Sequence, residues 1–218
     1  SLRRQRQMCI RDRASGIRSL LTKTSRDELG LQHVFTHKTG TDSLGVDYRH
    51  DSIDYVNDYE TVGEDSRDNI GIYGMIQRNF GRHDLSGSLR YDDDELFGDK
   101  TTGNIVYAYS LTPNQQLGAS YGTAFKAPSL YQLSASDGFA TSGNDDLGAE
   151  TSKNTELFWS YAKAGFNARA TLFENRIDDL IEYIGEYPDA HYINAGEARI
   201  RGVEPVSYTH LRAHETLR

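Results

Sequence analysis

The sequence is poor in cysteine, proline and long apolar runs, and each shortage excludes a class of protein. Its 218 residues include one Cys, four Pro and one Trp. A single cysteine cannot form a disulfide framework or a cysteine-ligated metal site. No run of 18 apolar residues is present, which excludes a transmembrane helix. The basic start, SLRRQRQMCIRDR, has no apolar core after it, so no signal peptide is indicated.

Tyrosine, glycine and acidic side chains are abundant instead. The chain holds 14 Tyr and 20 Gly, its mean hydropathy is -0.66, and its formal charge is -8. This composition suits soluble β proteins. It equally suits transmembrane barrels, whose strands alternate apolar and polar side chains and are not hydrophobic on average. The acidic balance disfavours nucleic acid as a partner.

The two ends differ from the rest of the chain. Residues 1–13 carry five Arg and the single Cys, and residues 205–218 (PVSYTHLRAHETLR) interrupt a regular strand pattern. Both resemble translated sequencing-adapter sequence, and we expect them to be artefactual extensions flanking a partial barrel over 14–204. The alternative is a genuine basic arm and a C-terminal helix. Residues 14–204 hold 17 basic and 30 acidic side chains, a net charge of -13, and no cysteine.

Period-2 alternation of apolar and polar side chains predicts about nine antiparallel strands. Residues 101–112 show it most clearly, with Ile105, Tyr107 and Tyr109 on one face and Val106 and Ala108 on the other. The expected strands are 28–37, 42–53, 67–80, 84–96, 101–112, 115–124, 153–163, 166–183 and 191–204.

The connections between these strands alternate in length. Short turns are expected near 38–41, 81–83, 113–114 and 164–165, and longer loops at 54–66, 97–100, 185–190 and from Phe125 to about residue 152. Pro128 cannot donate to a sheet, so the strand before it must stop near Phe125. An up-and-down meander with short turns at one end and long loops at the other is typical of bacterial outer-membrane barrels. A soluble sandwich or lipocalin-like barrel also alternates and stays open on pattern alone.

Four segments resemble the C-terminal half of TonB-dependent outer-membrane receptors. They are YGTAFKAPSLYQL (121–133), NDDLGAETSKNTEL (144–157), FENRIDDLIEYI (173–184) and YINAGEARIRGVE (192–204). Asp145 and Ala149 stand where the family usually has proline. DNIGIYGMIQRNF, LRYDDDELFG and INAGEARIRGVE are most similar to the vitamin B12 (cobalamin) receptor branch. The siderophore and haem branches share much of this pattern.

The resemblance implies part of a 22-stranded transmembrane β-barrel, all-β and antiparallel, located in the bacterial outer membrane. Such receptors take up a large scarce nutrient, here cobalamin or another metal chelate, and are energised by the TonB complex through a plug domain. This chain shows neither plug nor TonB box, so we expect a piece of barrel wall in contact with outer-membrane lipid. A siderophore or haem receptor, a passive porin-like barrel and a soluble binding module are the alternatives.

Aromatic side chains in the expected outside loops are the candidates for ligand contact, because rings can cover a large, partly apolar ligand. They are Tyr55, Tyr59, Phe97 and Tyr131, and Lys126 joins them as a cation that faces either ligand or interface. The competing interpretation is that these residues only pack the loops.

No catalytic or metal site is expected within the chain. The carboxylates lack a nucleophile motif, so we expect no enzyme. The acidic clusters at 54–65, 92–95 and 145–146 are interpreted as solvated loops, although loop carboxylates can bind calcium. The resemblance implies that cobalamin receptors use calcium, at loops mostly upstream of this segment. Arg90, Arg169, Asp47 and Glu156 are expected to form ion pairs on the wall.

Overall fold

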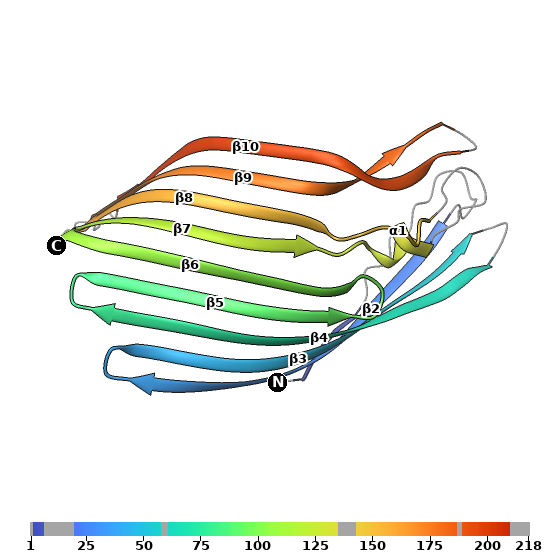
Figure 1. Cartoon of the computed structure of the whole chain (residues 1–218), viewed down its shortest axis with the longest axis horizontal. Coiled ribbons are helices and arrows are strands. Elements are labelled where there is room, and N and C mark those ends of the chain that lie inside the picture. Colours follow the sequence, from blue (N-terminus) through green and yellow to red (C-terminus); the bar gives the residue numbers. More distant parts are fainter. Residues whose placement is uncertain (1, 7–19, 58–60, 135–142, 187–188, 210–218) are drawn as a thin grey trace, which may run out of the picture.

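The chain forms one antiparallel sheet whose strand order follows the sequence. The structure is a computed structural model that describes residues 2–6, 20–57, 61–134, 143–186 and 189–209. Its strands are β1 (Leu2–Arg6), β2 (Leu20–His37), β3 (Gly40–Asn57), β4 (Thr61–Phe80), β5 (His83–Asp94), β6 (Gly98–Thr112), β7 (Gln115–Lys126), β8 (Glu150–Lys163), β9 (Phe166–Ile184) and β10 (His191–Thr209). One short helix, α1 (Leu130–Ser134), lies between β7 and β8, as Figure 1 shows. The meander predicted from the alternation is confirmed.

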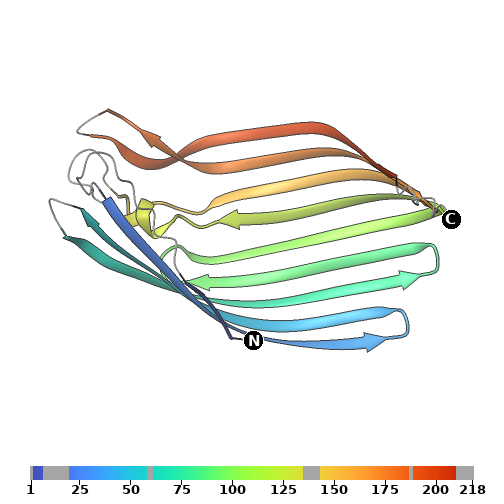
Figure 2. The same ribbon diagram turned by 180° about the vertical axis from the view of Figure 1, so that it is seen from behind.

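All four tight turns lie at one end of the sheet, which we call the turn end, and the longer connections lie at the other, the loop end (Figure 2). Gly81 and Gly165 occupy the turns after β4 and β8 with φ of 69° and 81°. Only glycine adopts this backbone conformation at no steric cost, so the two turns can stay short.

The two faces of the sheet differ in chemistry. Directly opposed residues share a face, and the face through Leu31, Val46, Ile72 and Tyr91 exposes large apolar side chains. Leu31 is 73 % exposed and Ile72 is 58 % exposed. We call this the outer face. The opposite, inner face carries the charged and amide side chains together with α1. Apolar-out, polar-in alternation is what a strand needs when lipid lies on one side.

The strands are tilted relative to the line of turns. One row of opposed outer-face residues begins at Phe35, two positions from the turn end of β2, and reaches Glu174, eight positions from the turn end of β9. The distance from the turn end grows along such a row only when the strands are tilted relative to the barrel axis. Strands must be tilted in this way to close a barrel. The chain is therefore a partial barrel.

Aromatic rings lie over glycines on the inner face. A Cβ on Gly45 would lie 2.2 Å from the Tyr73 ring, and one on Gly118 would lie 2.3 Å from the Phe158 ring. An arginine covers each ring in turn, with Arg90 5.7 Å from the centre of Tyr73 and Arg169 4.3 Å from that of Phe158. The ring thus packs against bare backbone below and a guanidinium above.

Two of the expected loops are strand instead. Residues 54–66 were expected to be a loop, but β3 continues to Asn57 and β4 begins at Thr61, with Asp54 opposite Glu64. Beyond the lipid, neither face of this hairpin needs to be apolar, so the strands continue without the alternation that identifies them. The loop expected at 97–100 is also wrong, because β6 already begins at Gly98.

The ends of the chain also carry strand. β1 pairs with β2, and β10 continues through 205–209 opposite β9, where the alternative interpretation had a helix. In the part of the chain that the structure describes, β10 pairs with β9 alone, so its other edge is open. Within the same part, no helix has the length and apolarity to cross a membrane.

Candidate functional site

The long connection after β7 comprises residues 127–149, and its described parts, 127–134 and 143–149, lie over the inner face at the loop end. Its apolar side chains Leu130, Leu133 and Leu147 form a buried cluster with Ile53 of β3. Tyr131, Ile181 and Tyr192 pack against this cluster. The helix α1 therefore lies against β3 and β4, although it follows β7 in the chain. Burial of these leucines fixes the loop on the wall.

The start of this loop is held by Arg67 of β4. The Nη1 of Arg67 donates to the carbonyl oxygen of Pro128 at 2.7 Å, and its guanidinium lies 5.8 Å from the centre of the Phe97 ring. Pro128 is fully buried and has no N–H of its own, so its carbonyl is the group left for the wall to bind. β7 ends at Lys126, two residues before Pro128.

The end of the loop is held by Asn194 of β10. Its Nδ2 donates to the Gly148 carbonyl at 3.0 Å, and its Oδ1 accepts the Gly148 N–H at 2.8 Å. The same amide donates to the Asp179 carbonyl at 2.7 Å. Asn144 adds a bond from its side chain to the Tyr192 carbonyl at 2.8 Å. One side chain thus ties the loop to both β9 and β10.

Glu150 completes the anchoring where β8 begins. Its carboxylate accepts from Lys126 Nζ at 3.0 Å and from the Ile181 N–H at 3.2 Å. Glu150 is buried, while the Lys126 side chain is 67 % exposed. The residues of the signature segments 121–133, 144–157 and 192–204 therefore meet in space, where they fasten one loop.

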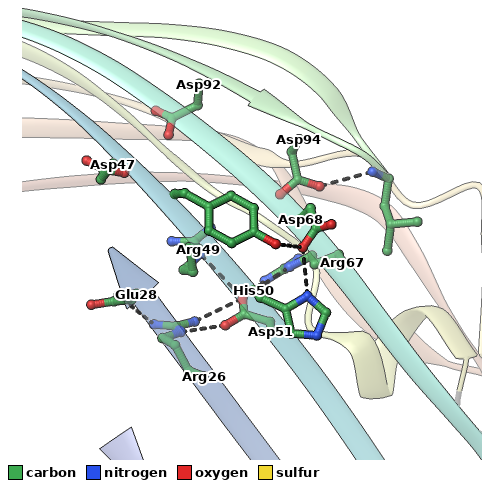
Figure 3. Close-up of polar contacts among 12 residues, drawn as sticks. Arg26, Glu28, Asp47, Arg49, His50, Asp51, Arg67, Asp68, Asp92 and Asp94 are labelled. Carbon is green, nitrogen blue, oxygen red and sulfur yellow. Dashed lines mark hydrogen bonds and ion pairs between the residues drawn. The ribbon is translucent and has the colours of Figure 1, made fainter. Parts of the chain in front are cut away.

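A buried carboxylate, Asp51 of β3, organises the arginines beneath the loop (Figure 3). Arg26 binds it with two bonds of 2.5 and 3.2 Å, and Arg67 with bonds of 3.3 and 3.2 Å. Arg49 Nε lies 3.4 Å from the same carboxylate. Among the described side chains of β3, the exposed apolar ones on the outer face end at Tyr48, so Asp51 lies beyond the lipid-facing part. Burial alone would raise the pKa of Asp51, but the Arg26 hydrogen bonds and the neighbouring positive charges outweigh it and lower that pKa.

The acidic stretch 92–95 is not the solvated loop expected from the sequence. Asp92 and Asp94 are 3 % and 2 % exposed and lie in β5 on the inner face. Asp92 Oδ1 forms an ion pair with Arg90 Nη2 at 2.7 Å, and Asp94 Oδ1 accepts a hydrogen bond from the Leu96 N–H at 3.0 Å. Burial raises the pKa of Asp94, opposed by the backbone N–H of Leu96 and the charge of Arg67. Side chains alternate between the two faces of β5, so Asp92 and Asp94 point to the inner face and become buried. A count of acidic residues does not reveal this alternation.

The wall ion pairs expected from the sequence are half correct. Arg90 binds Asp47 through two bonds of 2.7 and 2.8 Å, as predicted. Arg169 and Glu156 do not pair with each other. Arg169 stacks on Phe158 and donates to Thr171 Oγ1 at 3.3 Å, and Glu156 accepts from Asn154 at 2.8 Å.

Of the five predicted ligand-contact residues, the four that the structure describes lie at the loop end, in different surroundings. Phe97 lies between Arg67 and the Phe125 ring, whose centre is 5.6 Å away. Tyr131 packs on the leucine cluster, and Lys126 pairs with Glu150. Tyr55 lies near the end of β3, its backbone opposite Thr22 and Val62, and Tyr59 lies outside the described residues. Their contact with a ligand stays a prediction.

Sequence reasoning missed the residues that hold the loop, namely Arg67, Asp51 and Asn194. Asn194 lies inside a signature segment, so a search for polar residues in these segments would have found it. Arg67 lies one residue before DNIGIYGMIQRNF and would have been missed by the same search. Asp51 carries no such signal, because its role depends on the register of β2, β3 and β4. Among the described residues, no group of three or more His, Cys, Asp or Glu is placed to hold a metal ion.

Tilted strands, an apolar outer face and a loop fastened inside one end define the wall of a transmembrane β-barrel receptor. The family model of the TonB dependent receptor-like β-barrel matches residues 6–206. The chain belongs to this family, which consists of transport receptors and is not an enzyme class.

Individual relatives agree with this membership. The vitamin B12 transporter BtuB of Vibrio cholerae is 35 % identical over 161 residues, covering 73 % of this chain and 25 % of that protein. The siderophore receptor PirA from Pseudomonas aeruginosa has a TM-score of 0.71 at 22 % identity, covering 85 % of this chain and 40 % of the other. The FrpB iron transporter from Neisseria meningitidis has a TM-score of 0.73 at 16 % identity, covering 90 % and 35 %. The chain spans about a quarter of the length of the curated relatives it matches.

Proposed function

We propose that the chain is part of the barrel wall of an outer-membrane receptor that takes up cobalamin with energy supplied through TonB. The observation that carries the substrate is the 35 % identity to a vitamin B12 transporter over 161 residues. The loop end would face the outside, where ligand arrives, and the turn end the periplasm, as in other bacterial barrels. A plug domain elsewhere in the receptor would make the contact with TonB.

The fastened loop supports a role in ligand binding. A large ligand is bound best by groups already fixed in place, because ordering a free loop on binding costs affinity. The described parts of this loop, 127–134 and 143–149, are held by Arg67, Asn194 and the leucine cluster, and Phe97 and Tyr131 are among the aromatic residues there. We propose Phe97, Lys126 and Tyr131, with Tyr55 and Tyr59, as the side chains of this segment that contact ligand.

A siderophore receptor is the second candidate, favoured by the likeness of this sheet to siderophore and iron receptors. The deciding experiment measures binding of cyanocobalamin and of a ferric siderophore to the full-length receptor that contains this chain. Cobalamin binding at submicromolar concentration, with no siderophore binding, is the expected result. Siderophore binding without cobalamin binding would exclude the first candidate. High single-channel conductance without binding of either would indicate the porin alternative.

The contribution of the chain itself is tested by Phe97→Ala and Lys126→Gln, which should each weaken cobalamin binding. Phe80→Ala removes an aromatic ring at the turn end of the outer face and serves as the matched control. Tyr131→Phe keeps the packing on the leucine cluster and removes only the hydroxyl. Unchanged affinity in Phe97→Ala and Lys126→Gln would assign these residues to loop packing alone.

A further inference from the structure

A row of three polar side chains crosses the inner face of β3, β4 and β5 near the loop end. Arg49 lies opposite Asn69, and Asn69 lies opposite Asp94. Ile70, the neighbour of Asn69 in β4, is exposed on the outer face, so the row points inward. Asn69 is 1 % exposed and Asp94 is 2 % exposed. We call these three side chains the Asn69 row.

Four polar atoms of the Asn69 row have no hydrogen-bond partner within the described part of the chain. They are Oδ1 and Nδ2 of Asn69, Oδ2 of Asp94 and Nε of Arg49. The Arg49 Nε lies 3.4 Å from the Asp51 carboxylate without forming a hydrogen bond to it (Figure 3). A buried donor or acceptor without a partner destabilises the folded state, so four such atoms in one row need a common explanation.

The rows on either side of the Asn69 row are paired by guanidinium groups. On the turn-end side, the Arg90 guanidinium binds both Asp47 and Asp92. It lies over Gly71, where a Cβ would be 1.9 Å from Arg90 Nη2. On the loop-end side, Asp51 holds its own arginines. The row between them differs, because the Asn69 amide occupies the position that glycine leaves free in the row of Arg90.

The chemistry of the four atoms selects the molecule that can pair them. Asn69 Nδ2 and Arg49 Nε are donors, whereas Asn69 Oδ1 and Asp94 Oδ2 are acceptors. The donors would repel a cation and the acceptors would repel an anion. Protonation of Asp94 would pair the two acceptors with each other and leave both donors unpaired.

Water is able to pair all four atoms, because it donates two hydrogen bonds and accepts two. Buried waters typically bind about three polar groups that otherwise have no partner. Directly opposed residues on one face of a sheet have Cβ atoms about 4.5–5.5 Å apart. A water between two such side chains spans this gap with hydrogen bonds of ordinary length.

We propose that Arg49, Asn69 and Asp94 form a binding site for ordered, buried water on the inner face of the wall. The water accepts from Asn69 Nδ2 and Arg49 Nε and donates to Asn69 Oδ1 and Asp94 Oδ2. Because Arg49 also pairs with Asp51, the water joins Asp94 to the charge network that holds the loop through Arg67. The site does not depend on which nutrient the receptor binds.

The test is a crystal structure of the full-length receptor, at a resolution that shows ordered water and from crystals grown with EDTA. Density is expected about 2.7–3.2 Å from at least three of the four atoms. A direct bond between Asn69 and Asp94, with no density between the side chains, would overturn the proposal. An ion that appears only in calcium-soaked crystals, with oxygen ligands at about 2.3–2.6 Å, would also overturn it.

Asp94→Asn separates water from a cation in the same crystals. The variant keeps the shape of the side chain and an oxygen that accepts from water, but removes the negative charge. The density should therefore remain in Asp94→Asn. Its loss would show that the charge held the occupant, which contradicts a water.

The sign of a stability change provides a measurement in solution. Asn69→Val removes the amide from the row, keeps a side chain of similar size and suits a strand. With water bound, the variant leaves Asp94 and Arg49 without their bridge and should unfold at a lower urea concentration than the wild type. Without water, it would remove two unpaired polar atoms and unfold at a higher urea concentration, which would refute the site.

Asn104→Val is the matched control, because it makes the same change at an exposed inner-face position of β6. Its urea midpoint should stay close to that of the wild type. An equal loss in Asn69→Val and Asn104→Val would assign the effect to the substitution itself and would count against a water at Asn69.

Discussion

Arg67 and Pro128, 61 positions apart in the sequence, are joined by a 2.7 Å bond from guanidinium to carbonyl. The same guanidinium holds Asp51, so the wall charge network and the loop share one side chain. Arg67→Gln should release the start of loop 127–149 and remove one of the cations around a buried carboxylate. A loss of about 2–3 kcal/mol is expected, since Arg26 still pairs with Asp51.

Limited proteolysis of the receptor in micelles measures this release. Cleavage within 127–149 should become faster in Arg67→Gln. Arg26→Gln removes a cation from the same carboxylate but has no bond to Pro128, and should leave the loop protected. Equal cleavage in the two variants would mean that the bond to Pro128 contributes nothing to the loop.

The two buried carboxylates beneath the loop should respond to pH in opposite directions. The pKa of Asp51 lies below its ordinary value of 3.8. Its stabilisation is therefore complete above that ordinary value and is lost as the pH falls through the lower folded pKa. The pKa of Asp94 lies above 3.8, so its ionised form opposes folding, and acidification through that raised pKa relieves the penalty.

Asp51→Asn and Asp94→Asn separate these contributions. Asp51→Asn should destabilise the receptor near neutral pH and flatten the acid side of its stability curve. Asp94→Asn should be neutral or stabilising at pH 7. Thermal unfolding of the wild type and the two variants between pH 3 and 7 is the measurement. If Asp94→Asn were less stable than the wild type at pH 7, the ionised Asp94 carboxylate could not be destabilising the folded state.

Asn194 should matter for the far end of the loop. Asn194→Asp keeps an oxygen for the Gly148 N–H but loses the donor to the Gly148 and Asp179 carbonyls. Leaving two carbonyls without that donor is expected to cost about 1–3 kcal/mol and to speed hydrogen exchange at Gly148. Asn154→Asp, on the wall in β8, is the comparison variant and should leave exchange at Gly148 unchanged.

Two glycines of β7 should differ sharply in their tolerance of a methyl group. A Cβ on Gly118 would lie 2.3 Å from the Phe158 ring and 2.7 Å from the Tyr107 carbonyl oxygen, whereas one on Gly122 would meet nothing closer than 3.5 Å. Gly118→Ala should therefore cost about 1–3 kcal/mol through overpacking, and Gly122→Ala should cost far less. Urea unfolding of the two variants is the measurement. Similar midpoints would show that Phe158 moves aside without penalty.

The sequence was sufficient for the meander because lipid imposes alternation on every strand it touches. Strands such as 67–80 and 101–112 were recognised for that reason, and the signature segments identified the family. Prediction failed where lipid no longer constrains the chain. The hairpin through 54–66 is paired without alternation, and Asp92 and Asp94 belong to a wall whose polar face is recognisable only once its partners are in place.

The loop contacts depended on long-range register and could not be predicted from spacing. Arg67 and Pro128 are far apart in the chain, and Asn194 reaches Gly148 only because β8, β9 and β10 lie side by side. Phe97, Lys126 and Tyr131 were correctly placed at the loop end. Their surroundings could be seen only in the structure. Phe97 contacts Arg67, Lys126 pairs with Glu150, and Tyr131 packs on the leucine cluster.

Loop 127–149 touches β3 through Ile53 and β10 through Asn194, seven strands apart in the sheet. The described parts of this loop, 127–134 and 143–149, therefore cross the inner face between strands that are not neighbours in the sheet. These contacts link the two halves of the wall at the loop end, where the hydrogen bonds of the sheet join only adjacent strands.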